Sequence, residues 1–279
     1  MKTIIIPTDF SDCANNASEY AAKLAKSIDA KVLLLHVYHV PLTSAPDFPD
    51  EVKTAEDLQK ENEIQLKQFA LRLEARSGII VNYKAVMGLA VDVILEEQNN
   101  ADLIVMGMHG ASKIQEALIG SIVTTVLRKS KVPVLVIPKN VSFKSIEQIV
   151  FACDYNPQTD VQALDALQNL LHDFSAKIHV FHVKMNANET SLEETISGVN
   201  IESKLHYLEH VYDIVESEDP VSSINDFIEK IHADMLAIIP HRYKLFERIF
   251  HKSISKSLAF HTHIPLLALP EVQKTSYIA

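Results

Sequence analysis

Short apolar runs alternate with amphipathic segments along the first half of the chain. The runs are unbroken rather than alternating in polarity, which is typical of strands covered on both faces of a sheet. They are Thr3–Pro7, Val32–Val37, Ile79–Ala85, Leu103–Met106 and Val134–Ile137. Strands that alternate with helices predict a parallel sheet with right-handed crossovers. We therefore expect an α/β fold, a doubly wound parallel sheet with the common strand order 3-2-1-4-5.

Helical spacing of apolar residues marks four segments between these runs. The first carries Ala14, Ala17, Ala21, Leu24, Ala25 and Ile28, the second Leu58, Leu66, Phe69 and Leu73, the third Val91, Ile94 and Leu95, and the fourth Ile122, Val126 and Leu127. Gly78 is the expected C-cap of the second helix, because glycine readily takes the left-handed conformation found there. Ser121 is the expected N-cap of the fourth helix, at Ile122–Arg128.

The second half of the chain repeats the first. The matched segments are Lys2–Phe10 with Glu147–Tyr155, Ala30–Val37 with Ala176–Val183, Ala101–Val105 with Ala233–Ala237, and Val132–Pro138 with Ile264–Pro270. Their order and approximate spacing are kept, which favours duplication over chance. We expect two similar domains, residues 1–139 and 145–279, with the boundary at the polar pair Lys139–Asn140.

Composition limits the partners and the compartment. Lys and Arg total 26 against 36 for Asp and Glu, a formal charge of −10, so neither nucleic acid nor an anionic membrane is an expected partner. Cys13 and Cys153 are the two cysteines and form no CxxC, which argues against a disulfide framework. The N-terminal apolar run is too short for a signal peptide, and no run approaches the ~18 residues of a membrane span. We expect a cytoplasmic protein.

Glycine is scarce and clustered. The chain has 6 glycines, where average usage would give roughly 20. Gly107, Gly110 and Gly120 all follow the fourth predicted strand. In a doubly wound sheet, ligands bind at the carboxyl ends of the strands where the order reverses, which places this cluster beside Asp9. Backbone N–H groups without side-chain obstruction, together with a helix N-terminus, suit a phosphate.

The cluster has the form G-x2-G-x9-G-S from Gly107 to Ser121. It is neither a Walker A loop nor a GxGxxG after the first strand, so the usual ATPase and dehydrogenase motifs are missing. Together with the Pro7–Ser11 opening, His36-Val37 and Val132–Ile137, this spacing resembles the universal stress protein family. The resemblance covers both halves, as in a tandem member.

The resemblance implies an adenine-nucleotide site in the first half, for ATP (or ADP or AMP), with or without Mg. Asp9 would contact the adenosine, the Val37 backbone would read adenine, and the glycines would line ribose and phosphates. The candidate site residues are Thr8, Asp9, Val37, Gly107, His109, Gly110, Gly120, Ser121, Ile122 and Val123. The resemblance also implies that Val134–Ile137 pairs with Leu266–Leu269 inside one chain, as an intramolecular pseudo-dimer.

Simpler interpretations stand beside these roles. The glycines could only make tight turns, Asp9 could cap the helix that begins near Ser11, and His109 could be an exposed surface residue. His36 and His182, at equivalent strand ends, are expected to be structural and hydrogen-bonded at the sheet edge. The second-half histidines, His206, His210, His241, His251, His261 and His263, lack a carboxylate or thiolate that completes a zinc pattern, so no metal site is expected.

The second half lacks the glycine cluster. It reads Ile239-Pro240 at that place, no glycine follows before Ser253, and proline removes an N–H. We therefore expect one nucleotide per chain and a stress-response or regulatory role without catalysis, since no Walker lysine or acidic magnesium motif is present. The alternatives are slow ATP hydrolysis or self-phosphorylation through His109 or Ser112, and a nucleotide-free scaffold or small-ligand carrier. A homodimer of tandem chains and an unidentified protein partner remain open.

Overall fold

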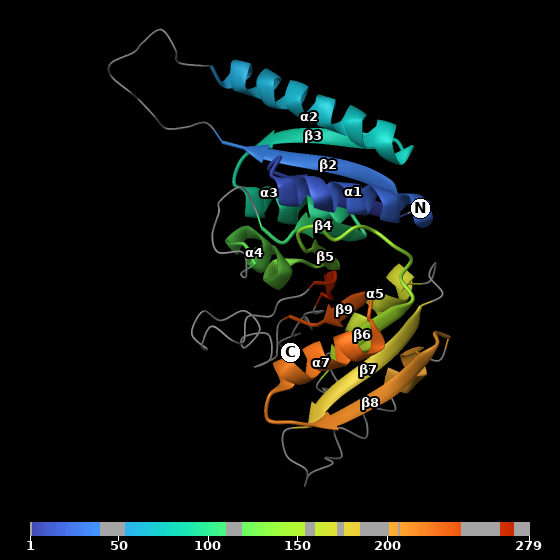
Figure 1. Ribbon diagram of the computed structural model, residues 1–279. Helices are drawn as coiled ribbons and strands as arrows, with labels where there is room; N and C mark the ends of the chain where they lie inside the picture. The colour runs from blue at the N-terminus through green and yellow to red at the C-terminus, as the bar shows by residue number, and fades with distance from the viewer. Residues whose placement is uncertain are drawn as a thin grey trace, which may run out of the picture.

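The computed structural model describes residues 2–39, 54–109, 119–153, 160–171, 176–184, 201–205, 207–240 and 263–270. Within these ranges, ten strands form one sheet in the order β3-β2-β1-β4-β5-β10-β9-β6-β7-β8 (Figure 1). The strands are β1 Thr3–Thr8, β2 Lys31–Tyr38, β3 Val81–Met87, β4 Leu103–Gly107, β5 Val134–Ile137, β6 Gln148–Cys153, β7 Lys177–Lys184, β8 His210–Glu216, β9 Met235–Ile238 and β10 Leu266–Ala268. Each half therefore has the predicted order 3-2-1-4-5.

Strands β5 and β10 join the two halves. They pair antiparallel, with Leu135 opposite Leu267, whereas the other neighbouring strands of the described sheet pair parallel. This confirms the predicted pairing within one chain. Because β5 and β10 run in opposite directions, the carboxyl ends of β1 and β4 share a sheet edge with the amino ends of β9 and β10.

Helices cover both faces of the sheet (Figure 1). They are α1 Asp12–Ser27, α2 Ala55–Ser77, α3 Ala90–Glu97, α4 Ser121–Lys129, α5 Asp160–Leu171 and α7 Pro220–Ile231, with a 3-10 turn η2 at Gln98–Asn100. Helices α1, α2 and α5 pack with one apolar cluster, and α3, α4 and α7 with the other. Successive strand residues point to opposite faces, so Ile4 and Ile5 belong to different clusters. Two covered faces explain the unbroken apolar runs.

The sequence prediction of β3 began two residues too early. Gly78 is the C-cap of α2, with φ +72°, as expected. The chain then needs Ile79 and Ile80 to reach the sheet, and Ile80 lies 80% exposed, so the paired strand begins at Val81. The apolar residues Ile79 and Ile80, which follow the C-cap, were therefore wrongly assigned to the strand.

An aspartate holds the amino ends of the strands in each half. Asp102 Oδ2 accepts a hydrogen bond from the Thr3 amide at 2.7 Å. Its counterpart Asp234 accepts from the amides of Glu147 and Gln148 at 2.8 and 2.9 Å. These bonds tie the start of the fourth strand to the start of the first. They give the repeated Ala-Asp pair a structural reason.

The two histidines at strand ends are structural, as predicted. His36 Nδ1 lies 2.7 Å from the Thr8 carbonyl oxygen, and His182 Nδ1 lies 2.9 Å from that of Cys153. Both rings are buried. Each therefore fastens the end of the second strand to the end of the first.

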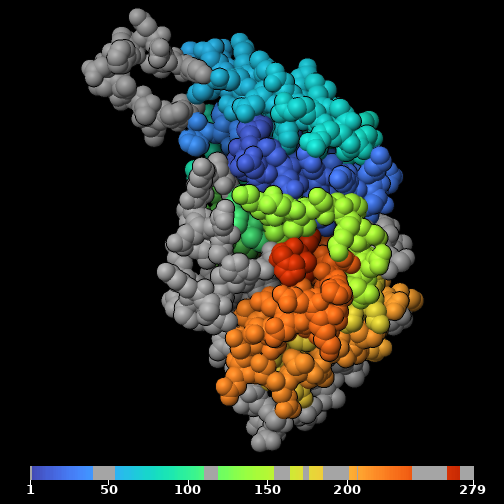
Figure 2. All heavy atoms as spheres, in the orientation of Figure 1, coloured from blue at the N-terminus to red at the C-terminus, as the bar shows by residue number. Residues whose placement is uncertain are grey.

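The segment between β5 and β6 lies against α1. Asn16 Nδ2 donates to the carbonyl oxygens of Pro138 and Val141, at 3.2 and 3.1 Å. The rings of Tyr20 and Phe143 meet edge to face, 5.2 Å apart. Figure 2 shows this light-green segment crossing the surface between the blue α1 and the red and orange second half. The connection between the halves is thus held against α1 at Pro138, Val141 and Phe143.

Candidate functional site

Strands β1 and β4 separate before they end. Among the described residues they pair at Ile4 and Ile5 of β1. Beyond these positions, β1 continues beside β2 as far as Thr8, and β4 continues beside β5 as far as Gly107. This divergence is the switch-point crevice of a doubly wound sheet. The structure therefore brings Thr8 and Gly107 to the ends of two neighbouring strands at this switch point, where the sequence predicted the site.

Gly107 lets α1 approach the end of β4. A Cβ atom at this position would lie 2.6 Å from the carbonyl oxygen of Cys13 and 2.7 Å from its carbon. These are backbone atoms of the first turn of α1, so no side-chain adjustment could relieve the clash. Gly107 therefore serves a close backbone approach at the end of β4 rather than a tight turn, and the same contact brings the N-terminus of α1 to the switch point.

The turn after β1 holds Asp9 at the crevice. Phe10 has φ +61°, and its amide donates to Thr8 Oγ1 at 3.1 Å. Asp9 Oδ1 accepts from the Ser11 amide at 3.1 Å, and Asp9 is exposed. The N-cap of α1 is Ser11, whose hydroxyl accepts from Ala14 N. Asp9 thus stabilises the turn before the cap rather than capping the helix itself.

Helix α4 begins without a side-chain cap. Its N-cap is Gly120, with φ −60° and ψ 151°, and no side chain among the described residues caps the first turn. The prediction of Ser121 as N-cap is wrong: Ser121 is the first helical residue, because the Gly120 carbonyl already accepts from the Thr124 amide at 2.9 Å. Within the described residues, the amides of the first turn, from Ser121 to Val123, therefore have no side-chain acceptor. Such a turn, at the positive end of the helix dipole, favours an anion.

The start of α4 is fixed at the sheet edge. The Gly120 amide donates to the Met108 carbonyl oxygen at 3.0 Å, and the Met108 amide donates to the Ile137 carbonyl oxygen at 3.0 Å. Gly107, Gly120 and Ser121 are therefore brought together at one edge. Gly110 and Ser112 lie outside the described residues.

His109 and Val37 complete the described candidates. His109 is half-buried rather than exposed, and its Nε2 atom is buried without a hydrogen-bond partner in the described part of the chain. A buried polar atom without a partner carries a desolvation cost. Val37 is half-buried in β2 and packs with the cluster that contains α3 and α4. Ile122 is exposed, and Val123 is buried.

The second half has a different edge. By the repeat, Pro240 stands where Met108 stands and has no amide to donate to the last strand. Ile239 stands at the position of Gly107 and is buried. Asp154 and residues 241–262, with His241, His251 and His261, lie outside the described residues.

Neither a metal site nor a membrane span is found in the part of the chain that the structure describes. No group of three or more His, Cys, Asp or Glu there could hold a metal ion. His210 begins β8, and its ring nitrogens lie 2.9 Å from the Leu208 carbonyl oxygen and 3.0 Å from Glu202 Oε2. None of the helices described is long and apolar enough to cross a membrane.

The fold and the site define a duplicated doubly wound α/β protein with an uncapped helix at its first switch point. The model of the universal stress protein family matches residues 1–138 and 145–270. The chain belongs to the universal stress protein family and carries the family domain twice.

Known relatives agree with this assignment. Universal stress protein MJ0531 of Methanocaldococcus jannaschii is 33% identical over 141 residues, which cover 50% of this chain and 82% of that protein. Universal stress protein Rv1636 of Mycobacterium tuberculosis is 32% identical over 143 residues, covering 49% and 95%. A solved universal stress protein from Archaeoglobus fulgidus is 22% identical, with a TM-score of 0.71 over 97% of this chain and 96% of that one. This last likeness supports the fold across both halves.

Proposed function

We propose that this chain binds an adenine nucleotide, with ATP the expected ligand, in the crevice between β1 and β4. The uncapped start of α4 carries the proposal. Its first-turn amides lie at the edge where β1 and β4 separate, and a helix N-terminus favours the negative charge of a phosphate. Membership of the universal stress protein family, whose G-x2-G-x9-G-S spacing the chain keeps, supports the same ligand.

The described residues suggest how the ligand would lie. The phosphates would accept hydrogen bonds from the amides between Ser121 and Val123. Asp9 and Thr8, on the other side of the crevice, would face the adenosine, with the Val37 backbone beside the base. His109 Nε2, which is buried without a described partner, would gain one from the ligand. ADP and AMP are the alternative ligands, and Mg would accompany the phosphates as an optional ion.

The role that follows is regulatory binding in a stress response rather than catalysis. Bound nucleotide would stabilise the loop from Gly107 to Ser121 and so bias the surface offered to a protein partner. The second half has Pro240 and no glycine at its corresponding edge, so one nucleotide would bind per chain.

Calorimetric titration of the full chain with ATP tests this proposal. We expect one site per chain and an affinity about tenfold lower in Ser121→Asp, a change of about 1.4 kcal/mol. A carboxylate in the first turn of α4 is favourable for the helix but repels phosphate, so binding falls without unfolding. Ser222→Asp, in the exposed first turn of α7, adds the same charge elsewhere and should bind ATP like the unchanged chain.

The outcomes separate the alternatives. Absence of binding for ATP, ADP and AMP would favour the nucleotide-free scaffold, and two equivalent sites would refute binding by the first half alone. A magnesium-dependent single-turnover assay with labelled ATP separates binding from slow hydrolysis. We expect the bound ATP to be recovered intact.

A further inference from the structure

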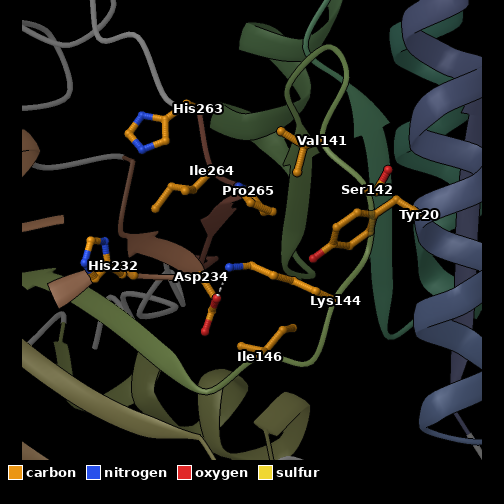
Figure 3. A pocket seen from close by; sticks show the side chains of 11 residues that line it. Tyr20, Val141, Ser142, Lys144, Ile146, His232, Asp234, His263, Ile264 and Pro265 are labelled. Carbon is orange, nitrogen blue, oxygen red and sulfur yellow. Dashed lines mark ion pairs between the residues drawn. The ribbon is translucent and has the colours of Figure 1, made fainter. Parts of the chain in front are cut away.

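A cavity lies where the two halves meet, apart from the proposed nucleotide site (Figure 3). Its volume is about 270 Å³. Helix α1 contributes Tyr20, the connection between the halves contributes Lys144 and Ile146, and the amino ends of β9 and β10 contribute Asp234 and Ile264. None of the candidate nucleotide-site residues is among those that line it.

The Asp234 carboxylate in this cavity is already satisfied. It is 8% exposed, its Oδ1 atom lies 2.6 Å from Lys144 Nζ, and its Oδ2 atom accepts from two backbone amides. Its charge is therefore balanced by protein groups. These bonds use most of its capacity to accept hydrogen bonds. Asp234 therefore has the same structural role in the second half that Asp102 has in the first.

The hydroxyl of Tyr20 is not satisfied by the protein. Tyr20 is 3% exposed, and no described residue forms a hydrogen bond with its hydroxyl, which points into the cavity toward the Lys144–Asp234 pair (Figure 3). Burial, with a further contribution from the Asp234 charge, raises the pKa of Tyr20, so the hydroxyl stays protonated. The Lys144 side chain is 70% exposed at the mouth of the cavity, and Asp234 takes one of the three N–H donors of its ammonium, which leaves two for solvent or a ligand. The unused capacity in the cavity is therefore mostly that of hydrogen-bond donors.

Apart from Ser142 and two histidines, the remaining wall is apolar. Val141, Ile146, Ile264 and Pro265 line it, and His232 and His263 are exposed at its rim. The Tyr20 hydroxyl and the Lys144 ammonium face the same cavity (Figure 3), and two such donors favour an anionic acceptor group, while apolar walls favour a carbon body. At about 270 Å³ the space is smaller than the sites of drug-sized ligands, which run to roughly 300–1,000 Å³.

We propose that this junction cavity binds a small organic carboxylate. The carboxylate accepts hydrogen bonds from the Tyr20 hydroxyl and the Lys144 ammonium, and its carbon body packs against Ile146 and Ile264. Residues of both halves and of their connection surround the ligand, so its binding stabilises the junction. The proposal does not rest on nucleotide binding.

The repeat supplies an internal comparison. The related cavity around Asp102 has a volume of about 490 Å³ and is lined by Lys131 just before β5, where the junction cavity has His263. There α5, the counterpart of α1, offers Asp165 and Ala166 instead of a tyrosine. The buried hydroxyl is therefore particular to the junction cavity, and the Asp102 cavity provides a control site.

Titration with butyrate tests the proposal on the full chain, in the presence and absence of ATP. With 3-fluorotyrosine in all 8 tyrosines, the ¹⁹F resonance missing from Tyr20→Phe identifies Tyr20. We expect this resonance to shift saturably with butyrate but not with the neutral isostere butyramide. By calorimetry, Tyr20→Phe should lower the affinity for butyrate about tenfold, as expected for a hydrogen bond to a charged group.

The controls keep the result interpretable. Because the Tyr20 hydroxyl has no described protein partner, Tyr20→Phe should leave the urea midpoint unchanged, and Lys131→Gln in the Asp102 cavity should leave butyrate binding unchanged. Equal butyrate affinity in Tyr20→Phe and the unchanged chain would overturn the site. An equal response to butyramide or to inorganic phosphate would overturn the assignment of an organic carboxylate.

Discussion

The carboxyl edges of the two halves differ, although the frames behind them are the same. Both halves fasten their strands with an aspartate at the amino edge and a histidine at the carboxyl edge. At the carboxyl edge, Gly107 admits α1 where the second half has Ile239, and Met108 donates an amide where the second half has Pro240. The two halves therefore share the aspartate and the histidine that connect neighbouring strands, and they differ in the residues at and after the end of the fourth strand. Ligand chemistry is a property of the edge and not of the fold.

The largest effect on stability is expected at Gly107, where the first half has no side chain and the second half has Ile239. Gly107→Ala places a methyl group 2.6 Å from the Cys13 carbonyl oxygen, so α1 must move away from β4. We expect a loss of about 3 kcal/mol in the free energy of unfolding, at the upper end for overpacking. Urea denaturation followed by circular dichroism measures it.

Gly88→Ala is the matched control for this variant. A Cβ atom at Gly88 would meet a methyl group of the Val93 side chain at 2.8 Å rather than backbone. A side chain can adjust more cheaply than a helix, so this change should cost less than half as much. Equal costs would mean that the approach of α1 does not determine the residue at Gly107.

The aspartates that the two halves share provide the next comparison. Asp234→Asn should lower the free energy of unfolding by about 2 kcal/mol, because Asp234 is buried and accepts hydrogen bonds from two amides and an ammonium. Asp102→Asn should lower it by about 1 kcal/mol, because Asp102 is exposed and accepts a hydrogen bond from one amide. Urea unfolding at pH 7 compares them. A larger cost at Asp102 would contradict this account.

The contacts of Asp234 also predict how the stability of the chain depends on acid pH. Burial alone would raise the pKa of Asp234, but the hydrogen bonds from Lys144 and from the amides of Gln148 and Glu147 outweigh it and lower the pKa below 3.8. A lowered pKa adds stability above the unfolded value that is lost as pH falls through the folded value. Asp234→Asn should therefore flatten the decline of stability below pH 4.

Periodicity predicted the frame well because burial on both faces leaves a local mark. The apolar runs predicted all five strands of the first half within two residues. The pairing of β5 with β10 was predicted by the family resemblance and not by periodicity. The C-cap at Gly78 was also readable, because the backbone conformation there demands glycine. The strands and the cap could be predicted because they depend on neighbours in sequence.

Features that depend on contacts between residues far apart in the sequence could not be predicted. Ser121 is a good capping residue, but the extended conformation of Gly120 starts α4 one residue earlier. The reason for Gly107 is a contact with Cys13, far away in the chain. The junction cavity needs Tyr20 and Asp234 side by side, and no local pattern signals that meeting.

The smallest effect is expected at the outer edges of the sheet. By the repeat, β8 begins with His210 where β3 begins with Val81, which is buried. Burial lowers the pKa of His210, but the hydrogen bonds to the Leu208 carbonyl and the Glu202 carboxylate outweigh it and raise the pKa above 6.5. Both partners are acceptors, so both ring nitrogens must donate, and the folded chain favours the charged ring.

A raised pKa fixes the sign of the pH dependence. The contribution of His210 is fully present below pH 6.5, where the ring is charged in both states, and is lost as pH rises through the folded pKa. Because Glu202 is largely exposed, solvent screens the pair, and we expect about 0.5 kcal/mol. Urea midpoints of the unchanged chain and His210→Val, compared at pH 6 and pH 8.5, isolate this contribution. The difference between the two proteins should shrink toward pH 8.5, and a difference that grows would mean that the folded chain favours the neutral ring.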